Sequence, residues 1–259
     1  MKIVTFNIRC DYGQDGNNNF CFRKPLILEK LSREAADIIC FQEALPHMAA
    51  WLREALREYY VIGCGRSQSL EDEQMAIAYR PDRINLVQME TYWLSDTPCQ
   101  PGSRYLQQSA CPRICTEALF EELSAKQVFR VVNTHLDHEG AMAREQGLRQ
   151  IMGKLEKAEL FPKAPVIIAG DLNAEPDSRE MAVMKDYPLY TNVTQGIGIT
   201  YHGYWHTEPP CCIDYIFTKG FLCERVEKWK DEKDGVFLSD HYPLCALLYA
   251  GQEPSLERV

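Results

Sequence analysis

Short apolar runs recur along the chain, separated by turn residues and by segments of helical periodicity. Runs of about four to eight residues that are rich in β-branched and aromatic side chains are typical of β-strands. The runs are KIVTF, DIICF, MAIAYR, INLVQMETYWL, VFRVVNTH, PVIIAG, CIDYIFTK and HYPLCALLYA. This pattern predicts a fold that mixes strands with helices.

Apolar residues at helical spacing predict helices between these runs. One helix is expected across residues 23–36, another begins at Pro46, and another covers residues 141–160. Their inward faces would be Ile27, Leu31 and Ala35 in the first, Met48, Trp51, Leu52, Ala55, Leu56 and Tyr59 in the second, and Leu148, Ile151, Met152 and Leu155 in the third. A short helix should follow Asp177 and Ser178, either of which can cap its amino end.

The length and composition fit one domain. The chain has 259 residues, of which 46% are hydrophobic, and this is enough to bury a large core. Neither an internal repeat nor a long linker divides the sequence. We therefore expect a single domain over residues 1–250 and a frayed tail over residues 251–259.

The net charge bears on possible binding partners, and the cysteines and the amino terminus bear on the cellular compartment. A formal net charge of −9 would repel a polyanion such as duplex DNA. The segment MKIVTFNIRC lacks the apolar region and cleavage site of a signal peptide, and no run is long enough to span a membrane. Eleven irregularly spaced cysteines without a C-x-x-C pair disfavour a zinc site. We therefore expect a cytoplasmic protein with reduced thiols.

Polar residues with catalytic potential lie at the ends of several predicted strands. They are Asn7 after IVTF, Gln42 and Glu43 after IICF, His135 within VVNTHLDH, and Asp171 with Asn173 after VIIAG. Two further groups have the opposite order, since Asp214 begins IDYIF and the pair Asp240 and His241 precedes YPLCALLY. These groups can meet at one edge only if the last two strands run antiparallel to the first four. The order therefore predicts mixed sheets rather than a purely parallel one.

Each of these residues has a simpler explanation as a strand-end, turn or capping residue. Together, however, the carboxylates, amides and imidazoles supply what the hydrolysis of a phosphate ester requires. Glu43 and Asn7 offer oxygen ligands for Mg²⁺, and such ligands disfavour zinc or copper. Asp171 can orient and deprotonate the attacking water, which Asn173 can hold.

The histidines complete this hypothesis. His135 and His241 can donate hydrogen bonds to the oxygens of the phosphate as negative charge develops on them. Asp214 can fix the tautomer of one of these histidines and raise its basicity. Gly170 is expected to keep the approach to the phosphate clear.

Six motifs carry a family resemblance: TFNIR, FQEAL, NTHLDH, GDLNAEP, IDYIF and SDHYPL. In this order they resemble the endonuclease/exonuclease/phosphatase superfamily, which includes pancreatic-type DNases, apurinic endonucleases, inositol polyphosphate phosphatases, deadenylases and bacterial sphingomyelinases. The resemblance implies an α/β (α+β) fold of the DNase-like kind, a four-layer αββα sandwich of two packed mixed sheets flanked by helices. It also implies a metal-dependent hydrolase acting on phosphate ester bonds.

The resemblance implies a role for each matched residue. Asn7 and Glu43 would hold the metal, Asp240 would assist at the metal, and Asp171 and Asn173 would position the water. His241, oriented by Asp214, would be the catalytic histidine, and His135 would stabilise the transition state.

Further segments resemble a bacterial branch of uncharacterised or sugar-phosphate-directed members. These are WLSDTP at Trp93, CPRICTEA at Cys111 and TYHGYWH at Thr200. Because Arg and His donors suit a phosphate or a polar sugar, the branch resemblance nominates these substrate-binding residues: Arg104, Arg113, His138, Arg144 and His202.

We therefore expect a phosphoesterase that uses Mg²⁺, or alternatively Mn²⁺, and acts on a small, sugar-like phosphorylated substrate. An alternative is a nuclease or deadenylase-like exonuclease on single-stranded nucleic acid, and another is a degenerate scaffold that binds a partner through the old site. The sequence has no Lys/Arg-rich stripe, so we do not expect a duplex DNA substrate. Neither a membrane nor an obligate protein partner is expected.

Overall fold

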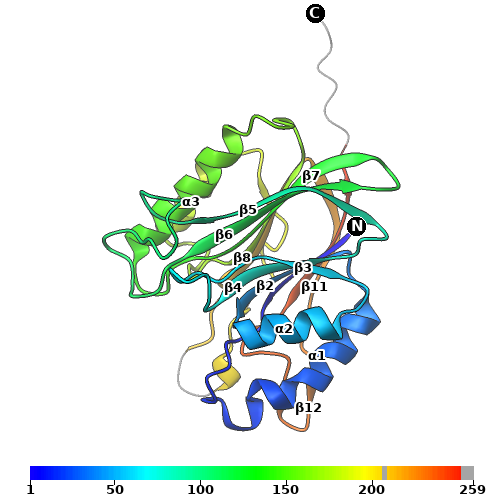
Figure 1. The fold of residues 1–259 in the computed structure, drawn as a ribbon. Helices are drawn as coiled ribbons and strands as arrows, with labels where there is room; N and C mark the ends of the chain where they lie inside the picture. Colours follow the sequence, from blue (N-terminus) through cyan, green and yellow to red (C-terminus); the bar gives the residue numbers. More distant parts are fainter. Residues whose placement is uncertain (206–208, 252–259) are drawn as a thin grey trace, which may run out of the picture.

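The computed structural model of the chain describes residues 1–205 and 209–251. Within these residues, two six-stranded sheets pack face to face (Figure 1). In spatial order the first sheet contains β11 (Phe221–Lys228), β14 (Leu244–Ala250), β1 (Lys2–Asn7), β2 (Ile38–Ala44), β4 (Gln74–Tyr79) and β3 (Tyr60–Ile62). The second contains β5 (Ile84–Trp93), β6 (Ile114–Glu122), β7 (Gln127–His135), β8 (Val166–Asp171), β10 (Asp214–Lys219) and β9 (Thr191–Asn192).

Helices cover the outer faces of the sheets. Figure 1 shows α1 (Phe20–Glu34) and α2 (Pro46–Ala55) against the first sheet and α3 (Ala141–Glu156) against the second. The remaining elements are the short 3₁₀ helices η1 (Gly16–Asn18), η2 (Glu180–Asp186) and η3 (Gly203–Trp205), and the paired strands β12 (Glu232–Lys233) and β13 (Val236–Phe237). The resulting four-layer αββα arrangement is the fold class expected from the sequence.

The alternation of side chains along each strand divides the core into layers. Ile3 and Ile167 pack in the core between the two sheets. The next residues point the other way, so Val4 packs under α1 and α2, and Ile168 packs under α3. Because successive side chains of a strand face opposite sides, a strand that is apolar throughout can be buried on both faces.

The strand directions confirm the prediction of mixed sheets. β1 is parallel to β2, and β7 is parallel to β8. β14 runs antiparallel to β1, and β10 runs antiparallel to β8. The carboxyl ends of four strands and the amino ends of β10 and β14 therefore lie at one edge of the sandwich.

Two of the longer strands, β6 and β11, were missing from the predicted runs, as were the short strands β3, β9, β12 and β13. β6 carries a buried Glu117, whose side chain accepts a hydrogen bond from Arg130 on β7 at 2.8 Å, so a polar residue interrupts its apolar pattern. β11 is an edge strand in which most side chains are at least partly exposed. Both strands form through pairing with neighbours that the local pattern does not reveal.

The predicted helix ends also differ from the structure. Residues 20–34 form α1, which ends where Ala35 takes a left-handed conformation with a φ of 44°. The helix predicted to reach residue 160 ends at Glu156, and Leu160 is 46% exposed, so it does not belong to the apolar stripe. The short helix begins only at Glu180, without a side-chain cap, so neither Asp177 nor Ser178 caps it.

Several other expectations can be set against the described residues. All eleven cysteines are free, as expected from their spacing. Within the described part of the chain, no helix is both long enough and apolar enough to cross a membrane. Most of the predicted tail, residues 252–259, and His206 of the TYHGYWH segment lie outside the described residues.

His202, a predicted substrate-binding residue, lies in an aromatic cluster instead. Its side chain is fully buried, with ring centroids 4.3 Å from Tyr242, 5.1 Å from Phe237 and 5.6 Å from Trp205. The backbone N–H of His202 donates to the carbonyl oxygen of Asp240 at 2.9 Å, which fixes the segment beside the site. His202 therefore packs among aromatic rings and is held to the backbone of Asp240.

The buried imidazole predicts a stability difference in acid. Burial, reinforced by the charge of His241, lowers the pKa of His202 to about 4, below the value of about 6.5 expected in the unfolded chain. Its contribution to stability is therefore complete above pH 6.5 and is lost as the pH falls toward 4. Urea unfolding at pH 7 and at pH 4.5 measures how much the free energy of unfolding falls between them. We expect this fall to be smaller in His202→Phe than in the wild type, with a difference on the order of 1–2 kcal/mol. Identical losses in the two proteins would contradict this.

Gly170 is required by the packing of β8 against β7. A Cβ atom at this position would overlap the carbonyl oxygen of Thr134 on β7. Gly170 thus allows the two strands to approach, which differs from the predicted role of clearing a path for phosphate.

We expect Gly170→Ala to lower the free energy of unfolding by at least about 1–3 kcal/mol, because the backbone of β7 cannot move aside. Gly153→Ala in α3 is the matched control, since its Cβ would meet no atom within 4 Å. The control should gain about 0.5–1 kcal/mol, since alanine favours a helix. Chemical denaturation measures both, and equal stabilities of the two variants would refute the packing argument.

Candidate active site

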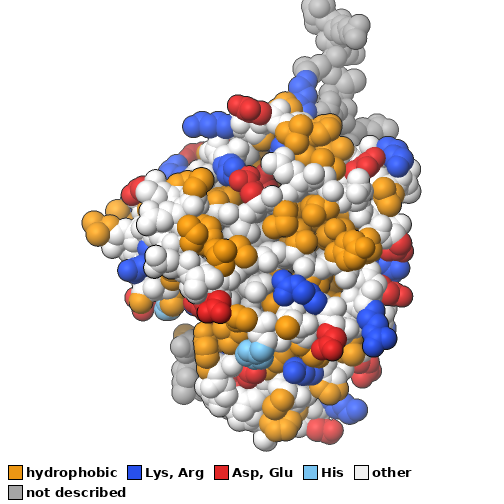
Figure 2. All heavy atoms as spheres, in the orientation of Figure 1, with side chains coloured by type: hydrophobic (Ala, Val, Ile, Leu, Met, Phe, Trp, Pro, Cys, Tyr) orange, Lys and Arg blue, Asp and Glu red, His pale blue; other side chains and the backbone are white. Residues whose placement is uncertain are grey.

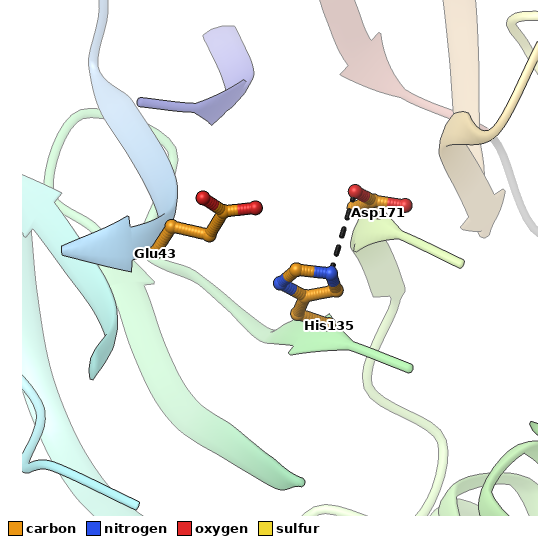
Figure 3. A group of neighbouring side chains, drawn as sticks. All are labelled: Glu43, His135 and Asp171. Atoms are coloured by element: carbon orange, nitrogen blue, oxygen red, sulfur yellow. Dashed lines mark ion pairs between the residues drawn. The ribbon is translucent and has the colours of Figure 1, made fainter. Parts of the chain in front are cut away.

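The predicted catalytic residues meet where the two sheets share an edge. Asn173 follows β8 and is partly exposed. The others lie at or beside the end of a strand and are at most 9% exposed: Asn7 on β1, Glu43 on β2, His135 on β7, Asp171 on β8, Asp214 on β10, and Asp240 and His241 just before β14. Figure 3 shows Glu43, His135 and Asp171 pointing toward one another from separate strands. The structure thus brings together residues that are far apart in the sequence.

Glu43 enters the site through an irregularity in β2. The register of β2 against β4 shifts between Phe41 and Ala44, and Glu43 has a left-handed φ of 63°. Such a bulge redirects a side chain, and a left-handed non-glycine residue is often found at a functional site. The carboxylate accepts hydrogen bonds from Asn7 Nδ2 and from the backbone N–H of Cys10, both at 2.8 Å.

The carboxylate of Asp171 both stabilises the turn after β8 and faces the site. Its Oδ1 accepts the backbone N–H of Asn173 at 2.9 Å, while Oδ2 accepts Asn7 Nδ2 at 3.0 Å. Leu172 between them is buried in the core. The turn therefore holds Asp171 and Asn173 on the side of the site.

Asn173 fixes the tautomer of His135. Asn173 Nδ2 donates to the carbonyl oxygen of Leu136 at 3.0 Å, and the same nitrogen lies 2.9 Å from His135 Nε2. Because a carbonyl oxygen can only accept, the amide nitrogen faces the ring, and Nε2 of His135 must be the acceptor. In the neutral ring the hydrogen then lies on Nδ1.

His241 is paired with Asp214. His241 Nδ1 lies 2.8 Å from Asp214 Oδ2, and its Nε2 lies 3.7 Å from Asp171 Oδ2. Burial alone would lower the pKa of His241, but the charge and hydrogen bond of Asp214 raise it to about 10. The ring is therefore protonated at neutral pH and can donate from Nε2.

The ionisable residues of the site have pKa values shifted in different directions. Burial, together with the negative charge of Asp214, raises the pKa of Asp171 to about 7. Burial would also raise the pKa of Glu43, but the two imidazoles and the hydrogen bonds from Asn7 and Cys10 lower it well below its usual range. Burial, assisted by the charge of Arg113, holds the pKa of His135 well below its usual value. A base, an ionised ligand and an acid can thus coexist at neutral pH.

Two groups of side chains could hold a metal among the described residues. In each group the candidate ligand atoms lie within 4.8 Å of one another: Glu43, His135 and Asp171 in the first, and Asp171, Asp214 and His241 in the second. Asp240 belongs to neither, since it accepts from Ser239 Oγ at 3.0 Å and lies 3.4 Å from Arg9 Nη1. Of the three predicted metal ligands, Asn7, Glu43 and Asp240, only Glu43 belongs to one of these two groups.

The amide of Asn7 is oriented as a donor. Its Nδ2 faces the carboxylates, while Oδ1 accepts the backbone N–H of Arg9 at 3.0 Å. For the oxygen to bind a metal, as the sequence predicts, the amide must turn and release these hydrogen bonds.

A cavity of about 660 Å³ opens at the site. It is lined by Arg113, His138 and Arg144, three of the predicted substrate-binding residues. The other two, Arg104 and His202, do not line it: Arg104 is exposed and donates to the carbonyl oxygen of Ser109 at 2.6 Å, and His202 is buried in the aromatic cluster.

Sequence reasoning missed several residues of the cavity wall: Arg9, Cys10, Arg66, Glu73, Cys111, Glu175, Ser178, Glu180, Tyr201 and Cys211. Arg66 and Glu73 come from the irregular segment between β3 and β4, where no periodic pattern points to them, and they pair at 2.8 Å. Burial and the charge of Glu43 raise the pKa of Glu73 to about 7. Tyr201 lies within the TYHGYWH segment, whose resemblance to the bacterial branch could have identified it as a residue of the site.

Comparisons with known proteins agree with this fold. A model of the Endonuclease/Exonuclease/phosphatase family matches residues 4–241. A solved endonuclease/exonuclease/phosphatase from Bacteroides vulgatus is 30% identical, with a TM-score of 0.89 over 96% of this chain and 98% of that chain. A mannosyl-6-phosphatase from Bacteroides thetaiotaomicron VPI-5482 is 24% identical, with a TM-score of 0.86 over 96% and 99% of the two chains.

A curated relative matches over a shorter part of the chain. An uncharacterized protein of Acanthamoeba polyphaga mimivirus is 25% identical over 183 residues, which are 68% of each chain. The family match covers every strand-end residue from Asn7 to His241, and the overall fold is shared across nearly the full length. This chain therefore belongs to the endonuclease/exonuclease/phosphatase family, a family of phosphoesterase hydrolases.

Proposed function

We propose that the protein hydrolyses a phosphate ester of a small, sugar-like substrate with Mg²⁺ and an activated water. The observation that carries this proposal is the separation of roles between Asp171 and His241. Asp171 has a pKa of about 7 and can accept a proton, while His241, whose pKa is raised to about 10, lies 3.7 Å away and can donate a hydrogen bond. A base beside a cationic donor suits attack by water on a phosphate, since negative charge develops on the phosphate oxygens, and the departing alcohol can take its proton from the solvent.

The donor set fits a hard divalent cation. Glu43 remains ionised, and each of its oxygens accepts one hydrogen bond from the protein and keeps a lone pair free. Together with the Asn7 amide, after it turns, Glu43 would hold the ion, since Mg²⁺ prefers oxygen ligands. When bound, Mg²⁺ would neutralise charge on the phosphate and polarise it toward attack.

The remaining residues would orient the reactants. Asp171 would take a proton from the attacking water, and Asn173 would hold that water through Oδ1, because its nitrogen is engaged with Leu136 and His135. His241 would donate from Nε2 to the phosphate, with Asp214 maintaining its orientation.

The residues that line the cavity away from Glu43 and Asp171 favour a polar leaving group. Arg144 Nε donates to Glu180 Oε1 at 2.6 Å, and Glu175 and Ser178 line the same wall, so donors and acceptors both face the space that a leaving group would fill. Sugar hydroxyls need both kinds of partner. On the face shown in Figure 2, basic side chains lie interspersed with acidic ones, and the net charge is −9, which favours a small substrate over a polyanion.

A substrate panel tests the proposal. Purified protein with Mg²⁺ would be offered sugar phosphates, phosphodiesters and single-stranded oligonucleotides, each with and without EDTA. We expect release of phosphate from small esters, and its loss on chelation. Cleavage of oligonucleotides without turnover of a small ester would favour the nuclease alternative and reject the proposal.

Asp171→Asn should lower kcat by about 10²–10⁴-fold, because an amide cannot accept the proton of the water. Binding of Mg²⁺, followed by calorimetry, should persist, since Glu43 is unchanged. Asp177→Asn in the adjacent exposed turn is the matched control and should keep wild-type kcat. Normal turnover in Asp171→Asn would remove this residue from the mechanism.

Glu43→Gln should raise the Mg²⁺ concentration for half-maximal activity by at least about tenfold, because it removes the ionised ligand. Titration of activity with Mg²⁺ measures this shift. Glu54→Gln on the exposed face of α2 makes the same chemical change away from the site and should leave the titration unchanged. Coincident curves for Glu43→Gln and the wild type would place the ion elsewhere.

A further inference from the structure

Arg113 is a buried cation whose hydrogen bonds are incomplete. Its side chain is 5% exposed and lines the cavity. Nη2 lies 2.8 Å from His138 Nδ1, but within the described residues neither Nε nor Nη1 has a hydrogen-bond partner. Buried donors are normally paired, so a buried guanidinium with unpaired donors calls for a specific explanation.

The carboxylate nearest to Arg113 does not complete its bonding. Asp137 Oδ1 lies 3.6 Å from Arg113 Nε, beyond hydrogen-bonding distance. The carboxylate of Asp137 is engaged elsewhere, by the hydroxyl of Ser109 and by the backbone N–H of Gly140 at 2.7 Å. Asp137 therefore balances the charge of Arg113 at a distance and leaves its donors open.

The other arginines of the cavity wall are paired. Arg66 lies 2.8 Å from Glu73 and Arg144 lies 2.6 Å from Glu180. Arg9 lies 3.1 Å from Asp15. Among the described arginines that line the cavity, Arg113 is thus the one without a carboxylate at hydrogen-bonding distance, and it is anchored only through His138, whose side chain is 47% exposed.

His135 adds another open donor beside Arg113. Its Nε2 accepts from Asn173, so the hydrogen lies on Nδ1, which is buried and has no partner among the described residues. Arg113 directly precedes β6, and the register that pairs Cys115 with Thr134 brings this end of β6 beside the end of β7, where His135 lies. Both residues line the cavity. Arg113 and His135 thus both offer open N–H donors, and the chemistry that satisfies such donors is an anionic acceptor.

We propose that Arg113, together with His135, binds a non-esterified oxygen of the substrate phosphate, and that the substrate is consequently a phosphate monoester. This inference rests on the proposed phosphoesterase function and specifies its substrate class. The guanidinium, tethered through one hydrogen bond, turns its free donors to the phosphate when the substrate enters.

The number of oxygens on the phosphate decides between ester classes. A monoester has three terminal oxygens and, near neutral pH, close to two negative charges, whereas a diester has two terminal oxygens and one charge. The cavity offers three kinds of partner for phosphate oxygens: the metal ligands at Glu43, the donor Nε2 of His241, and the open donors of Arg113 and His135. Three partners match the monoester, and the buried positive charge of Arg113 matches its second negative charge.

A pair of esters with the same leaving group tests the inference. The monoester is p-nitrophenyl phosphate and the diester is methyl p-nitrophenyl phosphate, both assayed at fixed Mg²⁺. We expect Arg113→Ala to lower kcat/KM for the monoester by about 10–100-fold and to change that for the diester by less than about threefold. Arg113→Lys, which retains the charge, should recover part of the monoester activity, and the exposed Arg104→Ala should match the wild type on both esters.

The ratio of the two losses distinguishes substrate recognition from damage to the fold. An equal loss on both esters, or an unchanged kcat/KM for the monoester, would overturn the inference. Turnover of the diester alone by the wild type would also overturn it, while leaving the phosphoesterase function intact. Thermal unfolding of each variant without ligand identifies a variant that fails to fold, in which case Arg113→Lys carries the comparison.

A binding measurement keeps the inference testable if neither ester is hydrolysed, an outcome that would count against the proposed function. Inorganic phosphate should raise the Tm of the wild type but not of Arg113→Ala, and dimethyl phosphate should shift both proteins equally. Equal protection of the wild type and Arg113→Ala by inorganic phosphate would reject the role of Arg113.

Discussion

The site depends on one amide placed between two buried carboxylates. Asn7 Nδ2 donates to Glu43 Oε1 at 2.8 Å and to Asp171 Oδ2 at 3.0 Å, and the second bond joins the first sheet to the second. Two buried carboxyl groups without such a donor would destabilise the fold, since polar groups and charges are poorly solvated there. The strand arrangement serves this contact, because β1, β2 and β8 must end at the same edge for the three side chains to meet.

The order of polar residues along the chain was enough to predict the strand directions. A carboxylate that begins a strand and one that ends a strand can share an edge only if the strands are antiparallel, and the pairing of Asp214 with Asp171 in the register of β10 and β8 shows this directly. The turn after β8 was also predictable from local chemistry. Asp171 closes that turn with one oxygen and faces the site with the other. A single conformation of the side chain therefore stabilises the turn and presents an oxygen to the site.

What could not be predicted depends on contacts between distant segments. The left-handed conformation of Glu43 follows from the shift of β2 against β4, which no pattern within FQEAL announces. The type of a residue does not give its burial, so Arg104 and Arg113 were equivalent candidates until the fold placed one on the surface and the other in the cavity wall. Arg66 comes from a segment without periodicity, and only its place beside the site identifies it.

Two carboxylates with similar burial have opposite protonation behaviour, and their partners explain why. The imidazoles of His135 and His241 lie near Glu43, and together with hydrogen bonds from Asn7 and Cys10 they favour its ionised form. Asp171 faces the negative charge of Asp214, which together with burial favours its protonated form. The same Asp214 raises the pKa of His241. One carboxylate therefore shifts the pKa of both Asp171 and His241, so a change at Asp214 would alter two protonation equilibria at once.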